Sequence, residues 1–173
     1  MIELTALREA IDVALSAGMP ELKTVEAFSA PQPGVALPAV FHALTGMQPG
    51  VDPGDGRCGV LATFKAVLVV QGEGSQASLE AATLAARLTV LLRKQFWGLA
   101  FVEGASNVQA SAIDPVPMAS PSTAWRVQWE QLMYLGDPQW PWPDEPPGSI
   151  VYGFSPDTGT GHAADYRSAE DMA

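Results

Sequence analysis

Residues 58–96 constrain the fold most, because their hydrophobic period changes from that of a strand to that of a helix. In Cys58–Gln71 every second residue is apolar, which is typical of a strand with one face in a core. Gly72-Glu73-Gly74 supplies the backbone freedom that a reversal needs, and Ser75 can cap a following helix. Leucines then recur at spacings of three and four as far as Phe96. The stretch predicts a strand, a turn and a helix about 30 Å long, which lies back on the strand's apolar face.

The rest of the first 136 residues predicts another helix and further strands. Apolar residues at helical spacing occupy residues 4–15, Gly18 ends that helix, and Pro20 prevents its continuation. The predicted strands are residues 22–28 (short and edge-type), 37–45, 58–71, 107–116 and 123–135, with 99–102 either loop or short strand. In the last strand Gln131 is the one polar residue on the buried face. The predicted fold class is α+β: a mostly antiparallel sheet of four to five strands packed by two helices, with an extended C-terminal arm.

A glycine- and proline-rich segment, residues 46–56, separates two of these strands. It holds four glycines and two prolines, so it predicts a long hairpin loop. A loop of this size either contacts a partner or is disordered, and we take Asp52, Asp55 and Arg57 as candidate interface residues. The two aspartates lack the twelve-residue frame and closing glutamate of a calcium loop.

The composition changes sharply at Gly136. Residues 137–148 hold five prolines and two tryptophans, which exclude a sheet interior. From residue 137 onward seven acidic residues face one arginine, which gives −6 of the total net charge of −10. The sequence therefore predicts a body, residues 1–136, and an arm, residues 137–173, that docks on its own body or on a neighbouring copy. The arm's candidate interface anchors are its aromatic residues, Trp140, Trp142, Tyr152, Phe154 and Tyr166.

Charge and hydropathy restrict the class of partner. The net charge of −10, with no basic run, argues against specific nucleic-acid binding, which depends on Lys and Arg. No apolar run approaches the ~20 residues that span a bilayer, and residues 1–18 do not have the pattern of a signal peptide. A single cysteine excludes an intramolecular disulfide and suits a reducing cytoplasm. We expect no membrane partner.

Few residues are candidates for catalysis. Neither His42 nor His162 has Cys, Asp or Glu at a ligand spacing, so we expect no metal and no cofactor. The glycine-rich segments lack the lysine and frame of a phosphate-binding loop. Cys58 on an apolar strand face is interpreted as a small buried hydrophobic residue. A Cys58/His42 nucleophilic pair, as in a small hydrolase, remains an alternative because such pairs assemble in space.

The order of these parts resembles the tail terminator proteins of Mu-like and lambda-like long-tailed bacteriophages. The matching segments are LTALREAIDVALSAGMPELKTVEAF, GVLATFKAVLVVQG with SLEAATLAARLTVLLRKQ, and WRVQWEQLMYLG, which together span residues 1–136; SPDTGTGHAADY is similar to a segment of some tail-completion proteins. The resemblance implies a non-enzymatic virion protein, assembled in the host cytoplasm, that forms a homo-oligomeric, hexameric ring at the head-proximal end of the tail. The ring would meet the tail tube protein on one face and the head–tail connector or neck protein on the other, and DNA would pass through it. A different neck or tail-completion protein, acting as a monomer or dodecamer, is the alternative within the virion.

Overall fold

The computed structural model describes residues 2–32, 34–116, 118, 120–139, 151–168 and 172. The chain divides into two compact units, Met1–Gln139 and Trp140–Ala173. The elements of the first unit are α1 (Ile2–Gly18), β1 (Thr24–Ala27), β2 (Ala39–Pro49), β3 (Cys58–Gln71), α2 (Ser75–Leu91), β4 (Ser106–Ile113) and β5 (Ser122–Leu135). The elements described in the second unit are β6 (Val151–Tyr152), the 3-10 helix η1 (Thr160–Asp165) and β7 (Arg167–Ser168).

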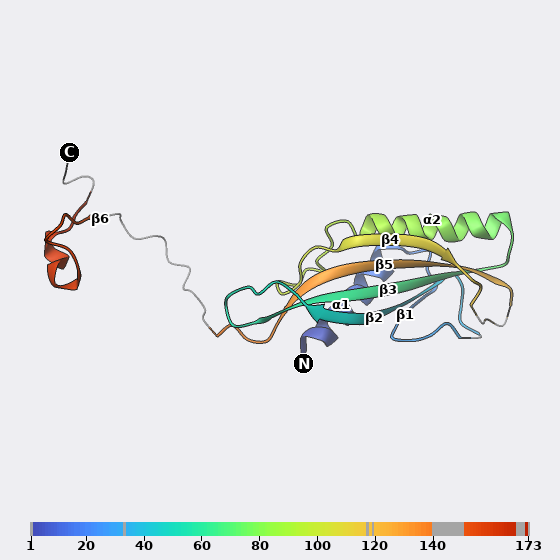
Figure 1. Cartoon of the computed structure of the whole chain (residues 1–173). Coiled ribbons are helices and arrows are strands. Elements are labelled where there is room, and N and C mark those ends of the chain that lie inside the picture. The colour runs from blue at the N-terminus through green and yellow to red at the C-terminus, as the bar shows by residue number, and fades with distance from the viewer. Residues whose placement is uncertain are drawn as a thin grey trace. The chain divides into compact units, whose positions relative to one another are not determined.

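The first unit is built on one five-stranded sheet in the order β1-β2-β3-β5-β4 (Figure 1). β1 and β2 are parallel, and all the other neighbours are antiparallel. β3 and β5 form the centre, paired without a break from Cys58↔Leu135 to Gln71↔Ser122. The predicted α+β class with a mostly antiparallel sheet is confirmed.

Both long helices pack on the same face of the sheet and share one core. The alternating apolar residues of β3, such as Phe64 and Leu68, meet the leucines of α1 and α2 there, as the hydrophobic periods predict. Trp129 of β5 lies in the same core, where its ring stacks on Phe64 with centroids 5.3 Å apart. The other face carries a smaller cluster around Phe41 and Val69, covered by loop residues.

Gln131 occupies the centre of this core with 0% of its surface exposed. Its side-chain oxygen accepts hydrogen bonds from the indole N–H groups of Trp97 (2.7 Å) and Trp129 (3.1 Å). Its side-chain nitrogen donates to the carbonyl oxygens of Gln95 (2.9 Å) and Glu103 (3.0 Å). The polar residue on the buried face therefore ties β5 to the segment that follows α2.

The hairpin of β2 and β3 differs from the prediction. β2 continues to Pro49, which pairs with Val60, so the loop is residues 50–57 and not 46–56. β3 is long enough to pair with β2 over this whole length, and a β-bulge between Leu44 and Gly46 shifts the register by one residue. A proline is tolerated here because it stands at the end of a strand.

The ends of α2 also differ from the prediction. Gly74, not Ser75, is the N-cap residue, and no side chain caps the helix. The helix ends at Leu91, short of Phe96, because the chain turns inward there: Lys94 and Trp97 adopt φ of 56° and 58°, and the Trp97 side chain is buried against Gln131. At the other side of the sheet β4 ends at Ile113, three residues before the predicted end.

Candidate functional site

Three of the predicted interface residues, Asp52, Asp55 and Arg57, lie in the loop of residues 50–57, at the end of the sheet where β5 ends (Figure 1). The loop folds tightly over the start of β3. The backbone N–H of Gly50 donates to the carbonyl of Gly59 over 2.8 Å. A Cβ at Gly59 would lie 1.9 Å from the carbonyl oxygen of Val51, so only glycine fits there. We call residues 47–57 the hairpin tip.

Asp55 and Arg57 lock the hairpin tip. The Arg57 side chain donates to Asp55 Oδ2 from Nε over 2.8 Å, with its Nη2 at 2.7 Å, and its backbone N–H donates to Asp55 Oδ1 over 3.1 Å. The guanidinium carbon lies 5.1 Å from the centroid of the Tyr134 ring on β5. The backbone N–H of Gln139 donates to the Asp55 carbonyl over 2.7 Å. The tip is thus in contact with Tyr134 of β5 and with Gln139 beyond it.

The Asp55 carboxyl should titrate below its ordinary pKa of 3.8, since hydrogen bonds from the Arg57 side chain and backbone stabilise its charged form. The same hydrogen bond raises the pKa of Arg57. Because the folded-state pKa of Asp55 is depressed, its contribution to stability is present above pH 3.8 and is lost as the pH falls through the lower value.

In the Arg57→Ala variant the pKa of Asp55 should rise toward 3.8. Carboxyl-carbon NMR titration of the two proteins would measure this change. Arg8→Ala on α1 is the control and should leave the Asp55 titration unchanged, because Arg8 pairs instead with Glu9 and Asp12. Equal Asp55 titrations with and without Arg57 would mean that the pair does not form in solution.

Apolar side chains project from the tip beside this lock. Val51 is 71% exposed and Met47 is 58% exposed. Asp52 is used internally, because its Oδ1 accepts from the backbone N–H of Gly54 over 2.8 Å. Sequence reasoning selected the charged residues of the loop and missed Val51 and Met47, although an apolar residue among glycines and aspartates was the available signal. The tip is a braced turn on which Val51 and Met47 are exposed to solvent.

The predicted anchors of the arm have different roles. Trp140 and Trp142 lie outside the described residues. Tyr152 and Phe154 are exposed, Phe154 to 65%. The Tyr166 ring packs against Gly153, where a Cβ would lie 2.7 Å from Cε1, and its hydroxyl accepts from the backbone N–H of Gly159 over 2.9 Å. Tyr166 therefore holds the second unit together, while Tyr152 and Phe154 face outward.

The alternative Cys58/His42 pair does not assemble. Cys58 is exposed at the start of β3, so its interpretation as a buried residue was wrong. His42 is only 2% exposed and pairs with Ala66, eight positions along β3 from Cys58, which puts the two residues about 26 Å apart. His42 Nε2 is instead hydrogen-bonded to Asp12 Oδ1 of α1 over 2.6 Å. This contact joins α1 to β2, and no spacing in the sequence could have indicated it.

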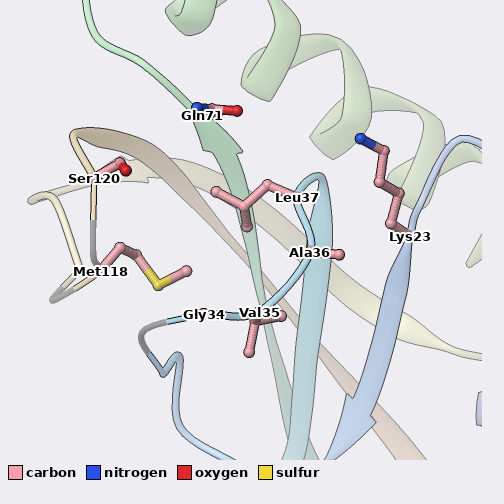
Figure 2. Close-up of a pocket in the computed structure, with 8 residues that line it drawn as sticks. All are labelled: Lys23, Gly34, Val35, Ala36, Leu37, Gln71, Met118 and Ser120. Atoms are coloured by element: carbon pink, nitrogen blue, oxygen red, sulfur yellow. The ribbon is translucent and has the colours of Figure 1, made fainter.

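An open hollow of about 330 Å³ lies beside the start of β2, lined by Lys23, Gly34, Val35, Ala36, Leu37, Gln71, Met118 and Ser120. Figure 2 shows the amine of Lys23 and the amide of Gln71 on opposite sides of Leu37. These polar groups do not converge on one point, as they do in a site that orients a small ligand. Within the described ranges, no group of three His, Cys, Asp or Glu side chains is placed to hold a metal ion. None of the helices that the structure describes is long and apolar enough to cross a membrane.

No protein-family model matches the sequence, and no curated protein matches it significantly. Among solved structures, the chain is similar to the cryo-EM structure of the PVC sheath/tube terminator, in its extended state, of an extracellular contractile injection system. The identity is 16% and the TM-score 0.31, over 89% of this chain and 63% of that one. The chain thus spans less than two thirds of that protein, and similarity at this level is too low to establish a shared fold or role.

Proposed function

We propose that this chain is a structural subunit of a phage-type tail, which forms a hexameric ring on the end of the tail tube, stops its polymerisation and provides the surface that joins the head connector. The order of helix, hairpin, crossing helix and two further strands in Met1–Gln139 matches the layout of the tail terminators that the sequence resembles. No catalytic residue, metal or cofactor is part of the proposal.

The observation that carries the proposal is the placement of apolar surface. Two of the exposed large apolar side chains, Val51 and Met47, lie on the hairpin tip, and the arm presents Tyr152 and Phe154. None of the residues 151–168 is buried, so this segment has no core of its own. Solvent-exposed apolar side chains are costly unless a partner covers them. Their presence on the hairpin tip and on a segment without a core is what we expect of a protein that works through contacts with other subunits. The ring, its partners and its position at the head-proximal end of the tail are inferred from the resemblance together with this surface.

Capping of tubes gives a direct test. The purified full chain, added to a polymerising phage tail tube protein, should produce shorter tubes that carry a ring at one end, as measured by negative-stain electron microscopy. Val51→Asp at the hairpin tip should weaken capping about tenfold, because a charge at an apolar contact is desolvated without a partner.

Val90→Asp provides the matched control, since Val90 on α2 is exposed to a similar extent and receives the same substitution. It should cap as the wild type does if the tip, and not the general apolar surface, makes the contact. Tubes of unchanged length with no ring at either end would contradict the proposed function. Equal losses from both substitutions would place the contact elsewhere.

A further inference from the structure

The outer edge of β4 is open within the described residues of the first unit, Met1–Gln139. β4 is the last strand of the sheet, and only its inner edge is paired, with β5. Its sequence, SNVQASAI, holds no charged residue and no proline, and six of its eight residues are exposed. Strand edges that remain in solvent are usually protected by Lys, Pro or a covering segment, since unpaired N–H and C=O groups recruit other strands. Within the described residues of Met1–Gln139 this edge has no Lys, Pro or covering segment, and its one irregularity is a β-bulge between Ser106 and Gln109.

The opposite side of the sheet offers a second open edge of similar length. β1 pairs only with Ala39–His42, so within the described residues of Met1–Gln139 the outer side of residues 43–49 of β2 has no strand beside it. This segment, ALTGMQP, is also uncharged, and its last five residues are exposed. The sheet therefore carries two uncharged free edges, of eight and seven residues, on opposite sides.

The strand directions make these two edges compatible. From β2 to β3, β5 and β4 each step is antiparallel, so β4 runs opposite to β2. If copies are related by rotation about one axis, β4 of one copy meets β2 of the next as an antiparallel neighbour, which is the more stable pairing.

The two edges are also offset along the strands. The strand pairings across β5 and β3 place Ile113 of β4 at the same height as Ala39 of β2, and Ser106 at the same height as Gly46. The unpaired part of β2 spans residues 43–49, so it lies further along the strand than β4 does. Pairing therefore shifts successive copies by about three residues, or about 10 Å. A constant shift from strand to strand is what tilts the strands of a closed sheet.

We propose that β4 of one copy pairs with residues 43–49 of β2 in the next copy of this chain, and that this contact closes the ring. The proposal rests on the ring of the proposed function and identifies the surface that builds it. The contact is heterologous, because two different edges meet; it can repeat around a ring, whereas pairing of β4 with β4 would stop at a dimer.

Proline substitution can test the edge without changing its charge. Along β4 the backbone N–H groups point alternately toward β5 and toward the open edge. Of the neighbouring substitutions Ala110→Pro and Ser111→Pro, one therefore removes an N–H that faces β5, and the other removes an N–H that faces the open edge. Loss of the N–H that faces β5 breaks a hydrogen bond of the sheet and should lower the melting temperature. The variant that keeps the wild-type melting temperature is therefore the one that has lost the N–H facing the open edge. In native mass spectrometry of the full chain this variant should shift from ring to monomer, with at least a tenfold loss of ring at equal concentration. Its control is Ala110→Ser or Ser111→Ala at the same position, which keeps the N–H and should keep the ring.

Cross-linking identifies the partner edge even if both proline variants unfold. In a Cys58→Ser background, Gln109→Cys chains mixed with Met47→Cys chains and a short bis-maleimide should give dimers that join the two variants, because both positions are exposed. Dimers of Gln109→Cys alone would overturn the proposal in favour of β4–β4 pairing. A folded proline variant that still forms the ring would overturn the edge contact but leave the capping function standing. A wild-type chain that stays monomeric with and without tubes would overturn both.

Discussion

Replacing Gln131 with leucine should lower the free energy of unfolding by about 3–5 kcal/mol. Leucine fills a similar volume but has no amide group. The indole N–H groups of Trp97 and Trp129 lose their acceptor, and the backbone carbonyls of Gln95 and Glu103 lose their donor. Each buried polar group left without a partner costs about 1–3 kcal/mol, and part of this is recovered when the loop relaxes. Since a domain of this size is stable by only about 5–15 kcal/mol, the loss should be visible as a large fall in the urea midpoint.

Gln128→Leu is the control for this substitution. Gln128 lies on the same strand, is only partly buried, and makes none of the contacts that Gln131 makes. We expect its free energy of unfolding to change by less than about 1 kcal/mol. If the Gln131→Leu protein is as stable as the Gln128→Leu protein, the four polar groups find other partners, and the role assigned to Gln131 is wrong.

Truncation after Gln139 should leave stability unchanged but reduce tube capping about a hundredfold. The cut preserves Gln139, whose backbone N–H bonds to Asp55, so the hairpin tip keeps its brace. The removed residues include two exposed aromatic side chains, Tyr152 and Phe154. Aromatic anchors buried at an interface each contribute more than about 1 kcal/mol, and two of them account for about two orders of magnitude. Urea denaturation and a titration of tube ends with truncated chain would measure the two effects separately.

The arm offers its own matched pair of variants. Tyr152→Ser with Phe154→Ser should reproduce most of the loss caused by truncation. Tyr166→Phe should retain capping, since it keeps the ring against Gly153 and loses only the hydrogen bond from Gly159. An unfolded truncated chain would contradict the independence of the body, and a truncated chain that caps normally would contradict the role of the arm.

The regular elements could be predicted where one period persists over many residues. Cys58–Gln71 was predicted with its observed bounds, because fourteen alternating residues leave one choice of face. The helix that follows was predicted to be capped by Ser75 and to reach Phe96, but its N-cap residue is Gly74 and it ends at Leu91. Its end depends on Trp97, which bonds to Gln131 thirty-four residues further along the chain. No local pattern carries that information.

The candidate site was less predictable for the same reason. The brace of the hairpin tip depends on Tyr134 and Gln139, which lie about eighty residues from Asp55 in sequence but beside it in the fold. The contact between Asp12 and His42 joins a helix to a strand, and each residue is ordinary in its own segment. Sequence could select charged loop residues and aromatic arm residues, but it could not separate Tyr166, which is used internally, from Tyr152 and Phe154.

The paired indoles of the core have a practical consequence. Trp97 and Trp129 lie with ring centroids 6.5 Å apart at 52° to each other, and both donate to one amide oxygen. Two chromophores so close and so fixed should couple optically and give a strong near-ultraviolet dichroism band. The band should vanish when the segment after α2 detaches from β5, so the protein carries an intrinsic spectroscopic probe of that event, and no label needs to be attached.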